Sequence, residues 1–283
     1  MLGIQEEFAC HWRIPKVPAF PAAGSKNAWE GFLVKRLLGA ALALLLLAGM
    51  SGAALAADVA VLNSQRTADW YAEVGWDYEA DMDVLRVTLQ VGGFSFAEIS
   101  VEDLEAGNLG DAKVLILPNT RRMSQAEVAS VKAFLSNGGK VFAVGQASFR
   151  DDSNKKVRDE SYQLADEIGI AYVTWSGSAP KHAFAKAVAK DHPIFAGLPE
   201  FIRFPRYWAM VNEVRGGAKI LAEWYDEDQV TPSQAVPENN GAIIEGPAGN
   251  VIYIGDMIFM PGGADQPELQ QLAINIIKYL LSK

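Results

Sequence analysis

The stretch from Lys113 to Val144 constrains the fold more than any other part of the sequence. It opens with the apolar run VLILP, continues with a segment that begins Ser124-Gln125-Ala126-Glu127, and closes with the apolar run KVFAV. The Ser-x-x-Glu pattern is a capping box, apolar residues follow at helical spacing, and Gly138-Gly139 ends the helix. Strand, capped helix and strand form a βαβ unit, whose two strands are parallel. The sequence therefore predicts an α/β fold.

Similar patterns extend this unit in both directions. Upstream, the apolar runs Val59–Leu62 and Phe94–Ile99 predict strands, and a helical pattern ending at Gly92-Gly93 lies between them. Downstream, a predicted helix at Tyr162–Ile168 leads into a strand at 172–175.

The C-terminal part has a different pattern. It contains three strand candidates, Lys219–Trp224, Ala242–Glu245 and Val251–Ile254, and the last two are joined by the hairpin-like connection Pro247–Asn250. A final helix has one apolar stripe and a starting cap of Asp265 and Glu268. We therefore expect a doubly wound, mostly parallel sheet with an antiparallel extension near the C-terminus, in a single domain over residues 57–283.

Residues 34–56 have the features of a secretory signal peptide. Lys35-Arg36 is followed by the uncharged apolar run 37–50, and Ala54-Leu55-Ala56 gives the small-x-small pattern of a signal peptidase site. The alternative is an uncleaved anchor, because the uncharged stretch approaches the roughly 20 residues that span a bilayer. Its last third is Ala, Gly and Ser, which favours cleavage. We expect a bacterial protein exported to the periplasm or the extracellular space.

A segment of 33 residues precedes this signal. It contains three prolines and no clear periodicity, and Val34 stands directly before the positive pair, where an initiating residue is expected. We interpret residues 1–33 as a mis-called or disordered N-terminal extension and Val34 as the start of translation.

Composition excludes several classes of function. Residues 57–283 hold 20 Lys and Arg against 31 Asp and Glu, a net charge of −11, which disfavours nucleic acid and anionic membranes as partners. Membrane contact is expected only through the signal segment, if it stays uncleaved. The one cysteine, Cys10, precedes the signal. Two separated histidines, and an acidic run at 226–228 without a glycine loop, indicate neither a metal site nor a cofactor.

The run KVLILPNTRRMSQAEVASVKAFLSNGGKVFAVGQAS, residues 113–148, resembles the class I glutamine amidotransferase-like superfamily. It is most similar to non-catalytic branches such as the β-galactosidase trimerisation domain. The stretches HPIF at 192–195 and GNVIYIG at 249–255 match as well. The resemblance covers most of residues 57–283 and implies a flavodoxin-like sheet.

In the catalytic branch of that superfamily, a cysteine in a Gly-x-Cys-x-Gly turn is the nucleophile, where backbone N–H groups stabilise its thiolate. The matching turn here is Gly145–Phe149, with Ala147 at the nucleophile position, and the stretch Gly255–Ile258 lacks the family's histidine. The resemblance therefore implies a catalytically degenerate domain. We expect a ligand-binding or assembly module in carbohydrate or cell-envelope processes.

A candidate ligand site follows from the topology, because ligands of open parallel sheets bind beyond the carboxyl ends of the strands. Amides, a hydroxyl and guanidinium groups there, with Trp70, Trp76 or Trp175 nearby, suit a neutral or anionic sugar or another small molecule. The alternative is that they are ordinary surface side chains paired with carboxylates. The predicted site residues are Asn63, Gln65, Arg66, Asn119, Arg121, Arg122, Gln146, Ser148 and Arg150.

Two other interpretations remain open. A hydrolase could use a site around Ser148, Arg150 and Asp151, but a serine nucleophile needs a base, and only His182 and His192 follow the signal. Aromatic residues could form a surface for self-association or for an envelope protein if they are exposed, and belong to the core if they are buried. These are Trp70, Tyr71, Trp76, Tyr78, Phe201, Phe204, Tyr207 and Trp208.

The export hypothesis predicts the N-terminal residue of the precursor and that of the processed protein. In a bacterial host, the precursor should start at Val34 and the processed protein at Ala57, as measured by N-terminal sequencing. A peptide from residues 1–33 in the precursor would contradict the predicted start.

Overall fold

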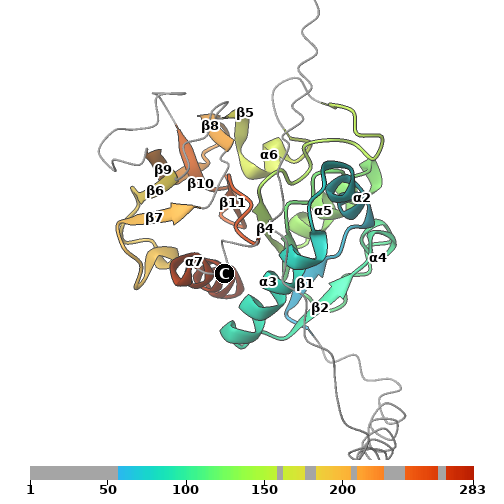
Figure 1. Cartoon of the computed structure of the whole chain (residues 1–283), viewed down its shortest axis with the longest axis horizontal. Coiled ribbons are helices and arrows are strands. Elements are labelled where there is room, and N and C mark those ends of the chain that lie inside the picture. Colours follow the sequence, from blue (N-terminus) through green and yellow to red (C-terminus); the bar gives the residue numbers. More distant parts are fainter. Residues whose placement is uncertain (1–56, 158–161, 176–182, 205–208, 226–239, 261–265) are drawn as a thin grey trace, which may run out of the picture. The chain divides into compact units, whose positions relative to one another are not determined.

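The structure is a computed structural model that describes residues 57–157, 162–175, 183–204, 209–225, 240–260 and 266–283 (Figure 1). Contacts divide the chain into the units Met1–Ala53 and Ala54–Lys283, and the described residues all lie in the second. The predicted signal segment, the side chain of Trp175, and residues His182, Tyr207, Trp208 and 226–228 lie outside what is described.

A mixed sheet of eleven strands runs through the described residues, and its N-terminal part is parallel. Five strands lie in the order β2-β1-β3-β4-β11, each parallel to its neighbours. Three of them, β1, β3 and β11, are buried at every residue, as expected for strands covered on both faces. Their bounds are β1 Val59–Leu62, β2 Phe96–Ile99, β3 Val114–Leu117, β4 Lys140–Val144 and β11 Val251–Ile254.

The C-terminal part is antiparallel and larger than the sequence predicts. The hairpin at Pro247–Asn250 is confirmed, since it joins β10 to β11 in antiparallel pairing. From β10 the sheet continues through β9 and β6 to β7, while β8 pairs with β10 and with β5. The bounds are β5 Ile170–Trp175, β6 Ala183–Ala187, β7 Phe201–Phe204, β8 Ala209–Val214, β9 Lys219–Tyr225 and β10 Gly241–Glu245.

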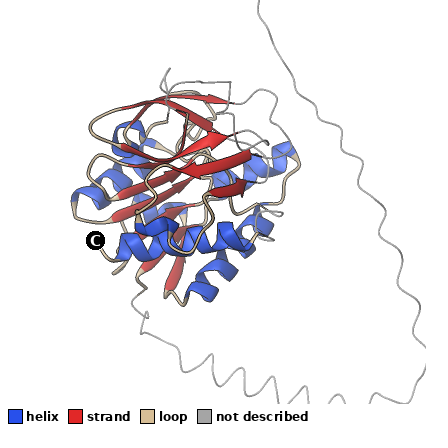
Figure 2. Cartoon of the chain, turned by 90° about the vertical axis from the view of Figure 1, so that its left-hand side faces the viewer, coloured by secondary structure: helices blue, strands red, loops and turns tan. Residues whose placement is uncertain are grey.

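Helices cover both faces of the sheet, as the doubly wound pattern predicts (Figures 1 and 2). Alternate strand residues point to opposite faces, so Val59 and Val61 join one core cluster, with α2, α3 and α7, while Ala60 and Leu62 join the other, with α4, α5 and α6. The bounds are α2 Gln65–Val74, α3 Tyr78–Gly92, α4 Val101–Glu105, α5 Gln125–Ser136, α6 Ala165–Ile168 and α7 Pro267–Leu281, with a 3-10 turn, η1, at Pro193–Phe195.

Local capping explains where the helices begin. The predicted capping box of Ser124 and Glu127 is confirmed at the start of α5. The last helix, α7, begins after Gln266 with Pro267 in its first position and no side-chain cap; the predicted Glu268 lies in its first turn, and Asp265 lies outside the described residues. The helix predicted at Tyr162–Ile168 is reduced to the single turn of α6.

The aromatic residues predicted as a possible surface patch are mostly core. Trp70, Tyr71 and Tyr78 pack edge-to-face in one cluster and are at most 7% exposed. Phe204 is fully buried, while Trp76 and Phe201 are half-buried.

Helices long and apolar enough to cross a bilayer are absent from the described part of the chain.

The packing of α5 predicts a difference between two matched substitutions. Val131→Ala removes a fully buried side chain on α5 and should lower the free energy of unfolding by about 2 kcal/mol, through lost burial and a residual cavity. Val91→Ala on α3 removes a side chain that is 62% exposed and should change it by at most about 0.5 kcal/mol. Urea unfolding measures both, and equal losses would contradict the assigned burial.

Candidate functional site

Two loops run side by side where β3 and β4 end. The backbone N–H of Ser148 donates to the carbonyl of Thr120 at 2.8 Å, and that of Arg150 donates to Arg121 at 2.9 Å. The N–H of Met123 in turn donates to the carbonyl of Arg150 at 3.0 Å. We call residues 118–123 and 145–150 the carboxyl-edge loops, because their pairing continues the parallel pairing of the strands before them.

The side chain of Asn119 joins these loops at their start. Its Oδ1 accepts a hydrogen bond from the N–H of Gln146 at 2.9 Å, and its Nδ2 donates to the hydroxyl of Tyr71 at 2.9 Å. That hydroxyl donates to the buried carboxylate of Asp81 at 2.5 Å. Gly145 has a φ of +61°, and a Cβ there would lie 2.5 Å from the Asn119 amide oxygen. Asn119 is therefore a structural support of the edge.

Ser148 is also a structural residue. It is fully buried, and its φ of +63° is in the left-handed region. Its Oγ accepts a hydrogen bond from the N–H of Leu164 at 3.1 Å. Within the described residues no histidine contacts this hydroxyl, since the His192 ring packs against Tyr279 with 4.5 Å between ring centroids. This geometry gives no support to a hydrolase built on Ser148.

Arg121 is the centre of the edge. Its guanidinium carbon lies 4.5 Å from the ring centroid of Trp70 and 5.1 Å from that of Phe149, and its Nη1 donates to the Oε1 of Gln146. Burial, followed by the positive charges of Arg150 and Arg122, lowers the pKa of Arg121 to about 10. Both rings hold the guanidinium by cation–π attraction.

The two other arginines of the edge differ in their partners. Arg122 donates through both terminal nitrogens to the carboxylate of Glu73, at 3.2 and 2.6 Å. Glu73 follows Trp70 by three residues on α2, so one face of this helix receives Arg121 and Arg122. Arg150 lies over the ring of Phe149 at 4.4 Å, and burial lowers its pKa. No side chain in the described part forms an ion pair with it.

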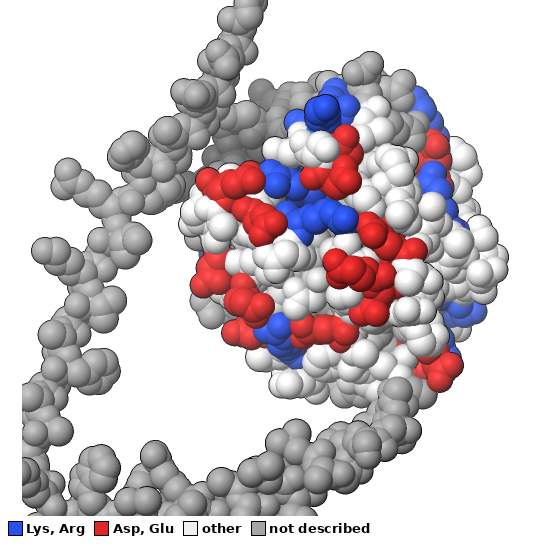
Figure 3. Space-filling view, turned by 90° about the vertical axis from the view of Figure 1, so that its right-hand side faces the viewer, with Lys and Arg blue, Asp and Glu red and all other residues white. Residues whose placement is uncertain are grey.

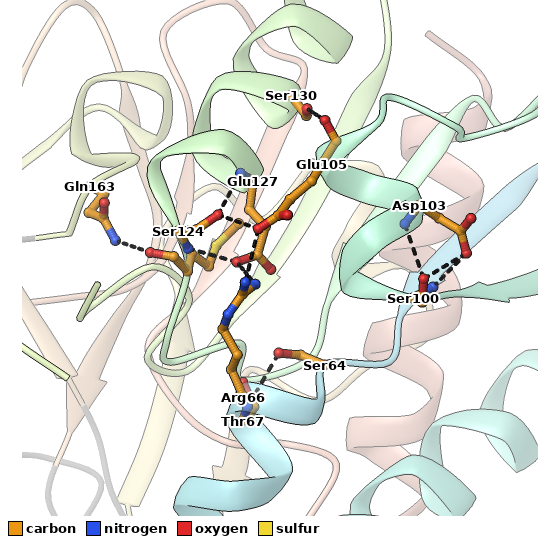
Figure 4. A network of polar contacts seen from close by, with 11 residues as sticks. Ser64, Arg66, Thr67, Ser100, Asp103, Glu105, Ser124, Glu127, Ser130 and Gln163 are labelled. Carbon is orange, nitrogen blue, oxygen red and sulfur yellow. Dashed lines mark hydrogen bonds and ion pairs between the residues drawn. The ribbon is translucent and has the colours of Figure 1, made fainter. Parts of the chain in front are cut away.

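Arg66 belongs to a separate network (Figure 4). Its Nη1 lies 2.7 Å from a carboxylate oxygen of Glu127 and its Nη2 lies 3.0 Å from one of Glu105, while Ser124 donates to both carboxylates. Glu127 is fully buried, and burial raises the pKa of its carboxyl. Arg66 therefore ties together α2, α4 and α5.

The structure thus separates the predicted site residues into three groups. Arg121, Gln146 and Arg150 come together at the edge. Two others, Asn119 and Ser148, support the loops from within. The remaining four are bound to carboxylates: Arg122 to Glu73, and the three that follow β1, with Asn63 bound to Glu98, Gln65 to Asp69, and Arg66 to Glu105 and Glu127.

Sequence reasoning missed Phe149 and Glu73. The signal for Glu73 was its spacing of three residues from Trp70, once the segment is recognised as a helix. Phe149 gave no signal beyond its place between Ser148 and Arg150.

Charge is distributed unevenly over the face of the molecule that carries α2 and α4 (Figure 3). Lys and Arg side chains gather in the middle of this face, and Asp and Glu side chains lie on both sides of them. The structure groups no three His, Cys, Asp or Glu side chains as metal ligands anywhere in its described residues.

Several solved structures share this fold, although no protein-family model and no curated protein matches the sequence. A β-galactosidase from Rahnella sp. R3 matches 87% of this chain and 34% of its own, with a TM-score of 0.62 and 16% identity. A ThuA-like protein from Bacteroides uniformis matches 83% of this chain and 96% of its own, with a TM-score of 0.58 and 14% identity. An α-L-fucosidase from Paenibacillus thiaminolyticus matches 80% of this chain and 33% of its own, with a TM-score of 0.51 and 20% identity.

At these identities the likeness is one of fold. The chain spans about a third of the length of the β-galactosidases that it matches. The structural neighbours include β-galactosidases, an α-L-fucosidase and a ThuA-like protein, and what they share with this chain is the fold.

The Arg66 network predicts a pH-dependent loss of stability. In Arg66→Met, buried Glu127 loses its cation, so its already raised pKa should rise further. At pH 7 the variant should lose about 2 kcal/mol of unfolding free energy, less than for a fully buried pair because Arg66 is 29% exposed. At pH 4 the loss should shrink, because a protonated Glu127 needs no cation. The loss grows as the pH rises above the usual pKa of a glutamate side chain.

Arg86→Met is the matched control, measured by urea unfolding at both pH values. Arg86 is 26% exposed and pairs with Glu79, Asp83 and Glu98, none of them fully buried. The substitution Arg86→Met should lower the free energy of unfolding by at most about 1 kcal/mol. A loss for Arg66→Met that is equal at both pH values would contradict the assigned role of Glu127.

Proposed function

We propose that this chain is an exported, catalytically degenerate amidotransferase-like domain that binds a small-molecule or glycan ligand in a carbohydrate-associated process. The ligand binds at the carboxyl-edge loops, beside Arg121, Gln146 and Arg150. Residues 34–56 direct export, and the domain acts by binding rather than by catalysis.

The position and surroundings of Arg121 carry this proposal. A guanidinium fixed between two aromatic rings and a glutamine has lost most of its rotational freedom before any ligand arrives, which reduces the entropic cost of binding. Its immediate contacts are the rings of Trp70 and Phe149 and the amide of Gln146. Arg66 and Arg122 each hold a carboxylate instead, so they are not part of the proposed site.

Topology supports the same location. The order β2-β1-β3-β4-β11 supports the flavodoxin-like sheet of our proposal, and in such a sheet the crevice lies at the switch point between the first and third strands. The loop after β3 carries Arg121 and lies beside this point. Ala147 is fully buried, and it occupies the position at which the resemblance expects the nucleophile of the catalytic branch. A buried methyl group there supports a binding role without catalysis.

The comparisons support a carbohydrate-associated role. β-Galactosidases and an α-L-fucosidase, which are named for sugar substrates, contain domains of this fold. The domain type in our proposal is therefore one that occurs beside carbohydrate-active domains.

A glycan-binding screen on the full chain tests the proposal. Arg121→Gln should weaken the affinity for any glycan found in the screen at least tenfold, about 1.4 kcal/mol, because it removes the charge and donors at the centre of the site. Arg215→Gln is the matched control, since Arg215 is 42% exposed and pairs with Glu213 on β8. Calorimetry gives both affinities, and a glycan bound equally by the two variants would contradict the site.

A further inference from the structure

We propose that the carboxyl-edge loops form an oxyanion site, so that the ligand of this domain carries a carboxylate or phosphate group held by Arg121 and Arg150. The inference rests on the proposed function, because it names the ligand class of the same site.

The first argument is the balance of charge. Three arginines, Arg121, Arg122 and Arg150, stand on two paired loops. Glu73 neutralises Arg122 through two short contacts. Asp151, the carboxylate whose charge acts on Arg150, is not within ion-pair distance of it; its Oδ1 accepts from the backbone N–H of Lys155 at 2.7 Å. Among the described residues, the edge therefore keeps an excess of positive charge, although residues 57–283 carry a net charge of −11.

The second argument is the supply of hydrogen-bond donors without acceptors. The Nε of Arg121 is buried and has no acceptor in the described part of the chain. Arg150 contributes a guanidinium whose described contact is the ring of Phe149, at 4.4 Å. Guanidinium groups present donors in a planar fork that matches the oxygens of a carboxylate or phosphate. One oxyanion in contact with both guanidinium groups would supply acceptors for their terminal nitrogens.

The third argument is the low hydration of the site. Burial, together with the neighbouring arginines, lowers the pKa of Arg121 to about 10, and burial lowers that of Arg150 as well. Both groups stay protonated at neutral pH, and each is partly withdrawn from water. Electrostatic attraction is stronger where water is excluded, so an anion gains more here than beside a fully hydrated arginine. A neutral sugar would bring hydroxyl groups but would not reduce the repulsion between the two cations.

The test is calorimetric titration of the full chain with three probes: D-galacturonate, D-galactose and inorganic phosphate. Galacturonate should bind at least tenfold more tightly than galactose, which differs from it by lacking the carboxylate. Phosphate should compete with galacturonate, and a rise in salt concentration should weaken both anions. Weak binding of phosphate alone would mean that the anionic group of the ligand is phosphate, which leaves the inference standing.

Variants assign the binding to the edge. Arg150→Gln should weaken the binding of the anion at least tenfold while leaving the fold intact, because the described structure gives Arg150 no side-chain hydrogen bond to lose. Arg121→Gln should do the same, and Arg215→Gln should bind as the unmodified chain does. Thermal unfolding of each variant checks that the fold is retained.

Three results would overturn the inference. If neither anion binds, the edge is not an oxyanion site. The same holds if both anions bind to Arg150→Gln as tightly as to the unmodified chain. If galactose binds as tightly as galacturonate and Arg121→Gln abolishes both, the ligand is neutral; the inference then fails, while the proposed function stands. The proposed function fails separately, if the glycan screen finds no ligand that depends on Arg121.

Discussion

The bridge between the two carboxyl-edge loops is the interaction on which the candidate site depends. Asn119 holds the N–H of Gln146 with its amide oxygen and the hydroxyl of Tyr71 with its amide nitrogen. The hydroxyl of Tyr71 in turn donates to the carboxylate of Asp81. A buried polar group costs free energy unless it is hydrogen-bonded, so this chain of contacts selects one arrangement of the loops. That arrangement brings Arg121 and Gln146 together.

The arginines of this region show how neighbours decide the role of a side chain. Arg66 meets a fully buried carboxylate and holds three helices together. Arg122 meets Glu73 and fastens α2 to the loop after β3. Arg121 instead meets two aromatic rings and an amide. Identical side chains therefore serve packing in two cases and, in our proposal, ligand binding in the third.

The parallel part of the fold was predictable because its signals are local. The capping box of Ser124 and Glu127 and the apolar run of β3 each lie within a few residues. β6, β7 and β8 escaped prediction, because they are short, mix polar with apolar residues, and pair with strands far away in the sequence. The site was predictable only as a set of loops. Nothing local indicates that Arg66 meets Glu127, which lies 61 residues later.

The sequence by itself determined the layered α/β pattern, the edge at which a ligand is expected, and the absence of cysteine from residues 57–283. These follow from residue type and periodicity, which need no knowledge of long-range contacts. Only the tertiary structure decided which polar side chains of the edge are taken by carboxylates and which converge. The physical reason is that an arginine has little specificity before it finds a partner. Its role is settled by charges and rings that folding brings within a few ångströms.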